Sequence, residues 1–215
     1  MLLVNYKSRL AHLVELLLLS ILLAVFSWFI HDQWPMRLFS FLALLAISWI
    51  ISDHYQFLKE LVYQLKHDFL SGKMAIFNLI GLQLGIAVAL YFRYSSQMTV
   101  LPLSWHWFLV IGVAIAIAEE CMFRGIVQST AEKMHYQAAP LVAALIHSAY
   151  KVTIFIPLAN SNPDVTSLFV GSFIAFAGLG YLKQFANSIV PAIIAHVVFD
   201  VLVYAEYTHA PWWVW

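Results

Sequence analysis

Residues 105–127, with the sequence WHWFLVIGVAIAIAEECMFRGIV, decide the fold. Every residue from 109 to 118 is apolar or glycine, and Glu119, Glu120 and Arg124 follow directly. A segment of this length can cross a bilayer, whose hydrocarbon core needs roughly 20 predominantly apolar residues. Charged groups inside such a segment are costly to bury in lipid, so they indicate a functional site within the membrane.

The composition of the whole chain indicates the same environment. Hydrophobic residues make up 63% of the 215 residues, and charged residues make up 10%. A soluble domain of this length could not bury so much apolar surface, so we expect an integral membrane protein with the lipid bilayer as its surroundings. The 11 basic and 11 acidic residues balance, which indicates no nucleic-acid partner. The single cysteine, Cys121, excludes an internal disulfide and a cysteine-based zinc site.

Further apolar windows predict the rest of the fold. Together with 105–127, the windows long enough or nearly long enough to span are 10–29, 38–51, 74–91, 138–158, 167–181 and 188–207. No internal repeat or domain boundary interrupts them. The sequence therefore predicts an all-α, polytopic membrane bundle of about seven or eight transmembrane helices, forming one domain over residues 1–215 with a core at about 105–204.

The distribution of basic residues predicts the orientation, because lysine and arginine favour cytoplasmic loops. With the N-terminus inside, the inner segments hold Lys7, Arg9, Lys59, Lys66, Lys73, Lys133 and Lys183. The outer segments hold only Arg37 and Arg93, and most tryptophans fall at outer span ends. We expect an N-in, multi-pass protein. The absence of a visible eukaryotic targeting signal favours a bacterial inner membrane.

The inner connection at residues 53–73 predicts a helix of its own. Apolar residues recur there every three or four positions, with charged and amide residues between them. This pattern is typical of an amphipathic helix on the inner leaflet, acting either as an extension of the second span or as a surface that guides a substrate.

Helical spacing assigns different tasks to the charged residues of the fourth span. Glu120 and Arg124 are four residues apart, so an ion pair between them can neutralise both. Glu119 is rotated by about 100° from Glu120 and needs another partner or purpose. We therefore expect Glu119 to carry chemistry and the Glu120–Arg124 pair to support it. The alternative is a network of all three residues that only ties helices together.

Two histidines are predicted to lie at the depth of Glu119. Glu119, His147 and His196 each lie eight or nine residues from the inner end of a predicted span, which places them about 12–14 Å below the inner surface. A carboxylate beside imidazoles in a water-poor pocket suits general-base activation of water. A second histidine can stabilise an oxyanion, and His196 is the expected donor. Hydrolysis is the predicted chemistry.

Asp200 and Lys151 lie four residues beyond His196 and His147, respectively. Because both helices run outward, we expect the two side chains at a common level about 6 Å further from the inner surface. An ion pair between them would close the outer end of the site. The alternative is that Lys151 binds a substrate carboxylate.

These residues resemble the motifs of the CAAX prenyl endopeptidases and bacteriocin-processing enzymes, called the CPBP or Abi family. Its motifs are Glu-Glu-x-x-x-Arg, Phe-x-x-x-His and His-x-x-x-Asn/Asp. The first is complete at residues 119–124 and the third at 196–200. The second is partial, because Ala143 stands where phenylalanine is expected before His147.

The resemblance implies peptide-bond hydrolysis inside the membrane. The residues matching Glu119 and His147 would activate water, and those matching His196 and Asp200 would face the oxyanion. An ionised aspartate repels an oxyanion, so Asp200 is alternatively expected to orient His196. The family has also been described as metalloproteases, and these donors include enough nitrogen and oxygen atoms for zinc. The chain lacks a His-Glu-x-x-His helix, and Arg124 disfavours a dication, so a glutamic-type reaction without metal or cofactor is favoured.

The predicted function is thus an intramembrane endopeptidase with the catalytic residues Glu119, Glu120, Arg124, His147, His196 and Asp200. Its expected partner is a membrane-anchored peptide or protein: a CAAX-like tail, a leader peptide or a C-terminal sorting tail. The alternatives are a non-catalytic immunity or binding protein of the same fold, a zinc-dependent version of the protease, and a transporter or proton relay.

Overall fold

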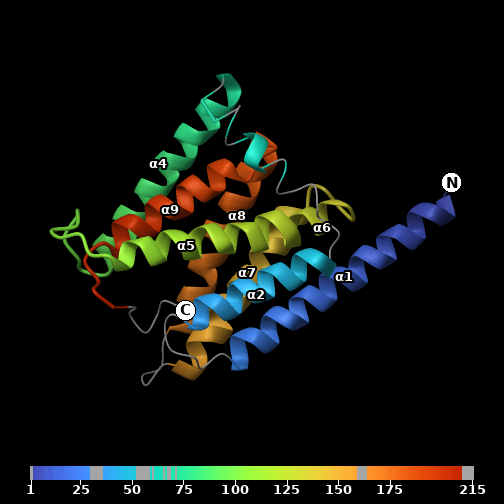
Figure 1. Ribbon diagram of the computed structural model, residues 1–215, viewed down its shortest axis with the longest axis horizontal. Coiled ribbons are helices and arrows are strands. Elements are labelled where there is room, and N and C mark those ends of the chain that lie inside the picture. The colour runs from blue at the N-terminus through green and yellow to red at the C-terminus, as the bar shows by residue number, and fades with distance from the viewer. Residues whose placement is uncertain are drawn as a thin grey trace. The chain divides into compact units, whose positions relative to one another are not determined.

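A computed structural model describes residues 2–29, 36–51, 59, 61–64, 66, 69–70, 72–158 and 164–209 (Figure 1). All regular structure in these residues is helical, which confirms the predicted all-α class. The helices are α1 (Leu2–Phe29), α2 (Met36–Ile51), α4 (Gly72–Ser95), α5 (Phe108–Glu120), the π-helix η2 (Cys121–Gln128), α6 (Ser129–Glu132), α7 (Ala139–Leu158), α8 (Val165–Ala186) and α9 (Val190–Tyr204).

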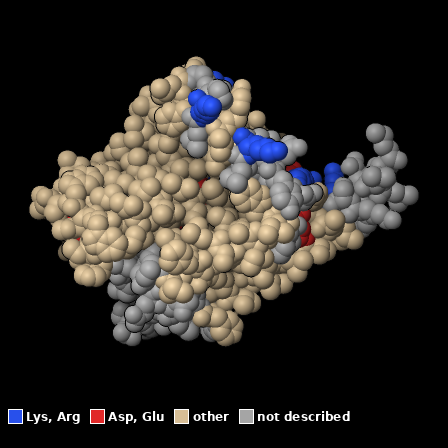
Figure 2. Space-filling model, in the orientation of Figure 1, with Lys and Arg blue, Asp and Glu red and all other residues tan. Residues whose placement is uncertain are grey.

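Among the described residues, three helical segments are long and apolar enough to cross a membrane: Arg9–Ser27, Gly72–Ser95 and Val165–Ala186. Shorter apolar helical segments cover Met36–Ile50, Ala139–Ile154 and Val190–Tyr204. On the face seen in Figure 2, most described residues are neither acidic nor basic. These features agree with a membrane protein, whereas the count of seven or eight spans and the N-in orientation stay predictions.

The chain divides into two compact units. The first draws on Met1–Tyr55 and Met122–Gly180, and the second on Gln56–Cys121 and Tyr181–Val214. The chain passes from the second unit to the first where the π-helix begins, and it returns within α8. The single domain over residues 1–215 stays a prediction.

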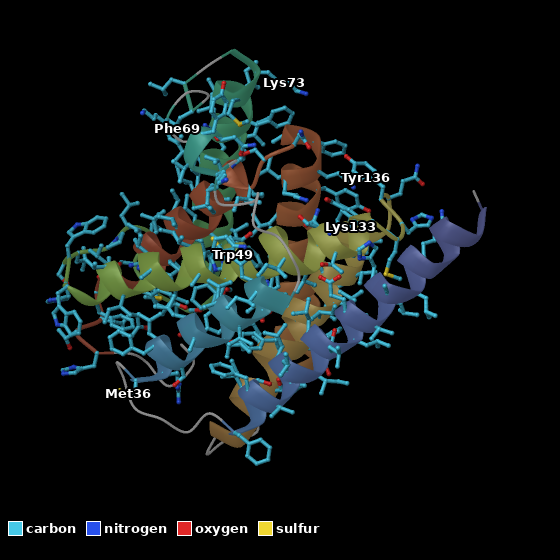
Figure 3. All side chains as sticks on the ribbon, turned by 45° about the vertical axis from the view of Figure 1, so that its right-hand side comes forward. Met36, Trp49, Phe69, Lys73, Lys133 and Tyr136 are labelled. Carbon is cyan, nitrogen blue, oxygen red and sulfur yellow. The ribbon has the colours of Figure 1, made fainter. Side chains whose placement is uncertain are left out.

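In the first unit, α1 and α7 pack side by side, and α2 joins them through aromatic rings. The ring of Phe41 in α2 lies 5.7 Å from that of Phe26 in α1 and 5.9 Å from that of Tyr150 in α7. Met36 begins α2 and Trp49 lies near its other end (Figure 3). A hydrogen bond of 2.5 Å between the hydroxyls of Ser27 and Thr153 also links α1 to α7. These contacts fix the position of α7, which carries His147.

In the second unit, α9 lies against α4 and α5 (Figure 1). Glycines permit the close approach of α4: a Cβ on Gly81 or Gly85 would collide with the backbone of Pro191 or Ala195. Gly112 in α5 likewise permits a close approach to α9, because a Cβ there would lie 3.1 Å from the Tyr204 ring. Small residues at helix interfaces let backbones approach closely in membranes. The α9 residues that follow Pro191 and Ala195 are therefore held firmly.

Most of the predicted amphipathic helix at 53–73 lies outside the described residues. Within the part that is described, Leu61 is buried against Ile189 and Val190. The amide of Gln64 accepts a hydrogen bond of 2.5 Å from the Ser188 hydroxyl. This segment therefore packs on the turn between α8 and α9, at the start of the helix that carries His196 and Asp200.

Candidate active site

The two glutamates end α5 and are completely buried. Glu119 and Glu120 have no exposed surface, and they follow an almost wholly apolar helix. Gly112, two turns earlier, brings α5 against α9, because its hypothetical Cβ would lie only 3.7 Å from the Cβ of Asp200. This close approach places the end of α5 beside the polar face of α9.

The second unit brings four predicted residues together, and we call them the carboxylate–histidine cluster: Glu119, Glu120, His196 and Asp200. His196 Nδ1 lies 2.9 Å from Glu120 Oε1, and its Nε2 lies 3.6 Å from Glu119 Oε2 and 3.9 Å from Asp200 Oδ1. All four residues are buried. An ionised carboxylate only accepts hydrogen bonds, so the His196 Nδ1–H donates to Glu120. One ring nitrogen of His196 is thus engaged, while the other faces two carboxylates.

The first unit holds the remaining two predicted residues in direct contact. Arg124 Nη1 lies 3.1 Å from His147 Nδ1, and Arg124 Nη2 donates to the Phe176 carbonyl oxygen at 2.9 Å. The imidazole of His147 stacks between two rings, with centroid distances of 3.7 Å to Phe123 and 3.5 Å to Phe176. We call Phe123, Arg124, His147 and Phe176 the histidine sandwich.

The π-helix explains why Phe123 and Arg124 could not be placed from spacing alone. From Cys121 to Gln128 the chain forms i→i+5 rather than i→i+4 hydrogen bonds, so each turn is wider than in an α-helix. All seven residues from Met122 to Gln128 are buried. Gln128 donates to the Gly180 carbonyl oxygen at 2.9 Å, which ties the end of η2 to α8. Segments of this kind are frequent at functional sites.

Several predicted contacts would join the two units and stay predictions. Glu120 belongs to the second unit and Arg124 to the first, and the same holds for Asp200 and Lys151, respectively. The structure therefore does not test either predicted ion pair. Joint action of His147 with Glu119 is likewise untested.

Sequence reasoning missed Phe123 and Phe176. The sequence lacks the expected phenylalanine at position 143, where a buried alanine stands, and no ring was predicted to pack around His147. Two phenylalanines from other elements, η2 and α8, supply that packing instead. Phe123 precedes Arg124 within the motif, so its position was a usable signal. Phe176 is one of many apolar residues in α8, so nothing in the sequence indicated its contact with His147.

Among the described residues, no group of three or more His, Cys, Asp or Glu side chains is arranged to hold a metal ion. The preference for a glutamic-type reaction stays a prediction.

The second unit combines buried carboxylates with a positioned imidazole, which is a composition suited to hydrolysis. Residues 100–202 match the family model described as Type II CAAX prenyl endopeptidase Rce1-like. This match confirms the family resemblance. The matched segment runs from the loop before α5 into the last turn of α9 and contains all six predicted site residues. No curated protein and no solved structure matches the chain. The Rce1-like family is a membrane-embedded protease family, which supports a peptidase activity for this chain.

Proposed function

We propose that the protein is an intramembrane endopeptidase that hydrolyses a peptide bond of a membrane-anchored substrate. The observation that carries this proposal is the carboxylate–histidine cluster, in which Glu119 lies 3.6 Å from an imidazole that Glu120 holds from its other side. A base that is oriented by a third group is the usual arrangement for activating a nucleophile. The match to an Rce1-like protease family over this segment supports the same chemistry.

Glu119 is the proposed general base. It removes a proton from water as the water oxygen attacks the scissile carbonyl carbon, and the carbonyl electron pair moves onto its oxygen. The resulting oxyanion then collapses, the C–N bond breaks, and the proton passes from Glu119 to the leaving nitrogen. Burial of Glu119 keeps bulk water out, which strengthens each electrostatic interaction in the step.

Asp200 is proposed to act through His196. Its Oδ1 lies 3.9 Å from His196 Nε2, one helical turn away on α9. An ionised Asp200 would repel an oxyanion, whereas it attracts an imidazole that gains a proton. Orientation of His196 is therefore the role that its charge favours.

We further propose an N-in arrangement in a bacterial inner membrane, supported by the excess of basic residues in the predicted inner segments. The substrate is a CAAX-like tail, a leader peptide or a C-terminal sorting tail. Each of these presents a peptide bond close to a lipid-anchored or apolar segment, which matches a catalytic group buried within the bilayer.

The test compares membrane peptides, by mass spectrometry, from cells that carry the wild-type protein or Glu119→Gln. We expect a set of cleaved peptides that disappears in Glu119→Gln, with equal amounts of folded protein. Glu132→Gln, in α6, is the matched control and should cleave normally. Identical peptides from wild type and Glu119→Gln would contradict catalysis and favour a binding or immunity protein. Loss of activity after exhaustive chelation, restored by zinc, would contradict the glutamic-type reaction.

A further inference from the structure

The loop between α4 and α5 exposes large apolar side chains. The sequence has no Asp, Glu, Lys or Arg between residues 94 and 118. Five residues of the loop, which we call the apolar loop residues, are each 58–80% exposed: Val100, Leu101, Leu103, Trp105 and Trp107. Exposed groups of this kind mark contact with a membrane or with another protein.

The backbone of this loop is not helical, yet side chains hold it firmly. The buried guanidinium of Arg93, in the last turn of α4, donates to Glu206 Oε2 at 2.7 Å. The other oxygen of Glu206 accepts the Leu103 N–H at 2.8 Å. The His106 N–H donates to the Ala205 carbonyl oxygen at 2.7 Å, directly after α9. The loop is thus tied to the ends of α4 and α9, all within the second unit (Figure 1).

The two properties of the loop together favour one environment. A lipid-exposed irregular backbone does not occur inside the hydrocarbon region, because its N–H and C=O groups would lack partners. Large apolar side chains are equally unsuited to bulk water. The membrane–water interface suits both, and tryptophan is enriched there. The loop also continues directly from α4, which is long and apolar enough to cross a membrane, so lipid is favoured over a protein partner.

We propose that the 97–107 loop lies at the membrane–water interface, inserts the apolar loop residues into the lipid, and thereby fixes the depth of the carboxylate–histidine cluster. Glu119 follows Trp107 by 12 residues of mostly helical chain. Measured along α5, this is about 18 Å, more than half of a hydrocarbon core of roughly 30 Å. The cluster is therefore near the middle of the bilayer. That this depth is a catalytic depth rests on the proposed function, whereas the position of the loop does not.

The first test measures depth by electron paramagnetic resonance of the full chain in liposomes. Cys121→Ala removes the only cysteine, so that a spin label can be attached at Leu103→Cys, Val110→Cys or Ile117→Cys. The last two positions are exposed on α5, and Ile117 lies about 15 Å beyond the loop. The ratio of oxygen access to nickel-chelate access should rise from Leu103 to Val110 to Ile117. Ser96→Cys, at an exposed polar position, is the control and should favour the nickel chelate.

Two results would overturn the proposal. Greater access of the nickel chelate than of oxygen at Leu103→Cys would place the loop in water. Protection from both reagents would show that another protein, or a second copy of this chain, covers the loop. Val100→Cys reports on the same loop if Leu103→Cys does not fold.

The second test asks whether Glu206 holds the loop. Glu206→Gln removes the ionised acceptor of the Leu103 N–H and of Arg93. The label at Leu103→Cys should become more mobile, and its ratio of oxygen to nickel access should fall. Glu132→Gln, in the first unit, is the matched control and should change neither reading. Equal mobility in Glu206→Gln and Glu132→Gln would overturn the anchoring role of Glu206.

Turnover of a quenched farnesylated CAAX peptide in the same liposomes tests the proposed function separately. If the wild-type protein cleaves no peptide, the proposed function fails. The spin-label readings need no substrate, so they still decide where the loop lies and how deep α5 is.

Discussion

Gly85 of α4 lies directly against the backbone of Ala195 in α9, the residue that precedes His196. A Cβ added to Gly85 would collide with the Ala195 carbonyl oxygen and would come within 3.0 Å of the Val198 Cβ. The position of His196 therefore depends on a glycine in another helix. The same packing recurs one turn earlier between Gly81 and Pro191.

Gly85→Ala should destabilise the protein and lower its activity, because α4 and α9 must separate to admit a methyl group. We expect a loss of about 1–3 kcal/mol, as for overpacking elsewhere. Thermal unfolding in detergent, together with peptide turnover, measures both effects. The control is Gly171→Ala in α8, where a Cβ meets nothing within 4 Å. That variant should be neutral or stabilised by about 0.5–1 kcal/mol; equal behaviour of the two variants would contradict the packing argument.

Glu120→Gln should lower kcat by about 10²–10⁴-fold with little change in KM. The neutral amide is a weaker acceptor for the His196 Nδ1–H, so the imidazole is held less firmly and a proton gained at Nε2 is less stabilised. Steady-state kinetics on the liposome-bound peptide measures this change. Glu132→Gln is again the control, and the expectation fails if both variants retain wild-type kcat.

Arg93→Lys should destabilise the second unit by about 2–3 kcal/mol. The buried guanidinium donates to the Thr99 and Leu202 carbonyl oxygens, to the Thr99 hydroxyl and to Glu206 Oε2, at 2.7–2.9 Å. A lysine cannot reproduce this fork of hydrogen bonds. Thermal unfolding tests the change, with Arg9→Lys at an exposed position of α1 as the matched substitution. A similar melting temperature for both variants would show that the fork contributes little.

Glu206 gives the second unit a pH-dependent stability. The Leu103 N–H and the Arg93 guanidinium donate to its carboxylate and hold its pKa below the ordinary value of 4.5. A lowered pKa stabilises the folded state above pH 4.5, and this stabilisation is lost as the pH falls through the folded-state pKa. Unfolding measured between pH 3 and 6 should therefore show a decline that Glu206→Gln flattens.

A second carboxylate with a lowered pKa, Asp164, serves as a comparison. Asp164 accepts hydrogen bonds from the Ser167 hydroxyl and backbone N–H at the start of α8, and these bonds lower its pKa. Asp164→Asn should flatten a separate part of the decline, because Asp164 lies in the first unit. If neither variant changes the decline in stability, other titrating groups must cause it.

The apolar windows of the sequence predicted most helices well, because each window is about as long as the helix that it forms. The windows 74–91, 138–158 and 188–207 correspond to α4 at Gly72–Ser95, α7 at Ala139–Leu158 and α9 at Val190–Tyr204. The window 167–181 was too short, since α8 continues to Ala186 through Lys183 and Gln184. Polar residues ended the apolar window there without ending the helix.

The association of Glu119 with His196 followed from equal predicted depth, and the structure brings these side chains within 3.6 Å. The contact between Glu120 and His196 was not foreseen, because an α-helical spacing pointed Glu120 toward Arg124. That spacing does not apply once the π-helix begins at Cys121. Backbone hydrogen bonding of this kind leaves no residue pattern that periodicity can detect. The contact of Phe176 with His147 depends on tertiary packing, and no residue pattern indicated it either.

The π-helix also limits how this segment can vary among related proteins. Eight consecutive residues, Cys121–Gln128, lie between the buried glutamates and the first residue of α6. Loss of one residue would turn all following side chains by about 100°, which would remove Phe123 or Arg124 from His147, or Gln128 from Gly180. Single-residue insertions and deletions are therefore not tolerated here, and an alignment of relatives should be free of gaps across this stretch.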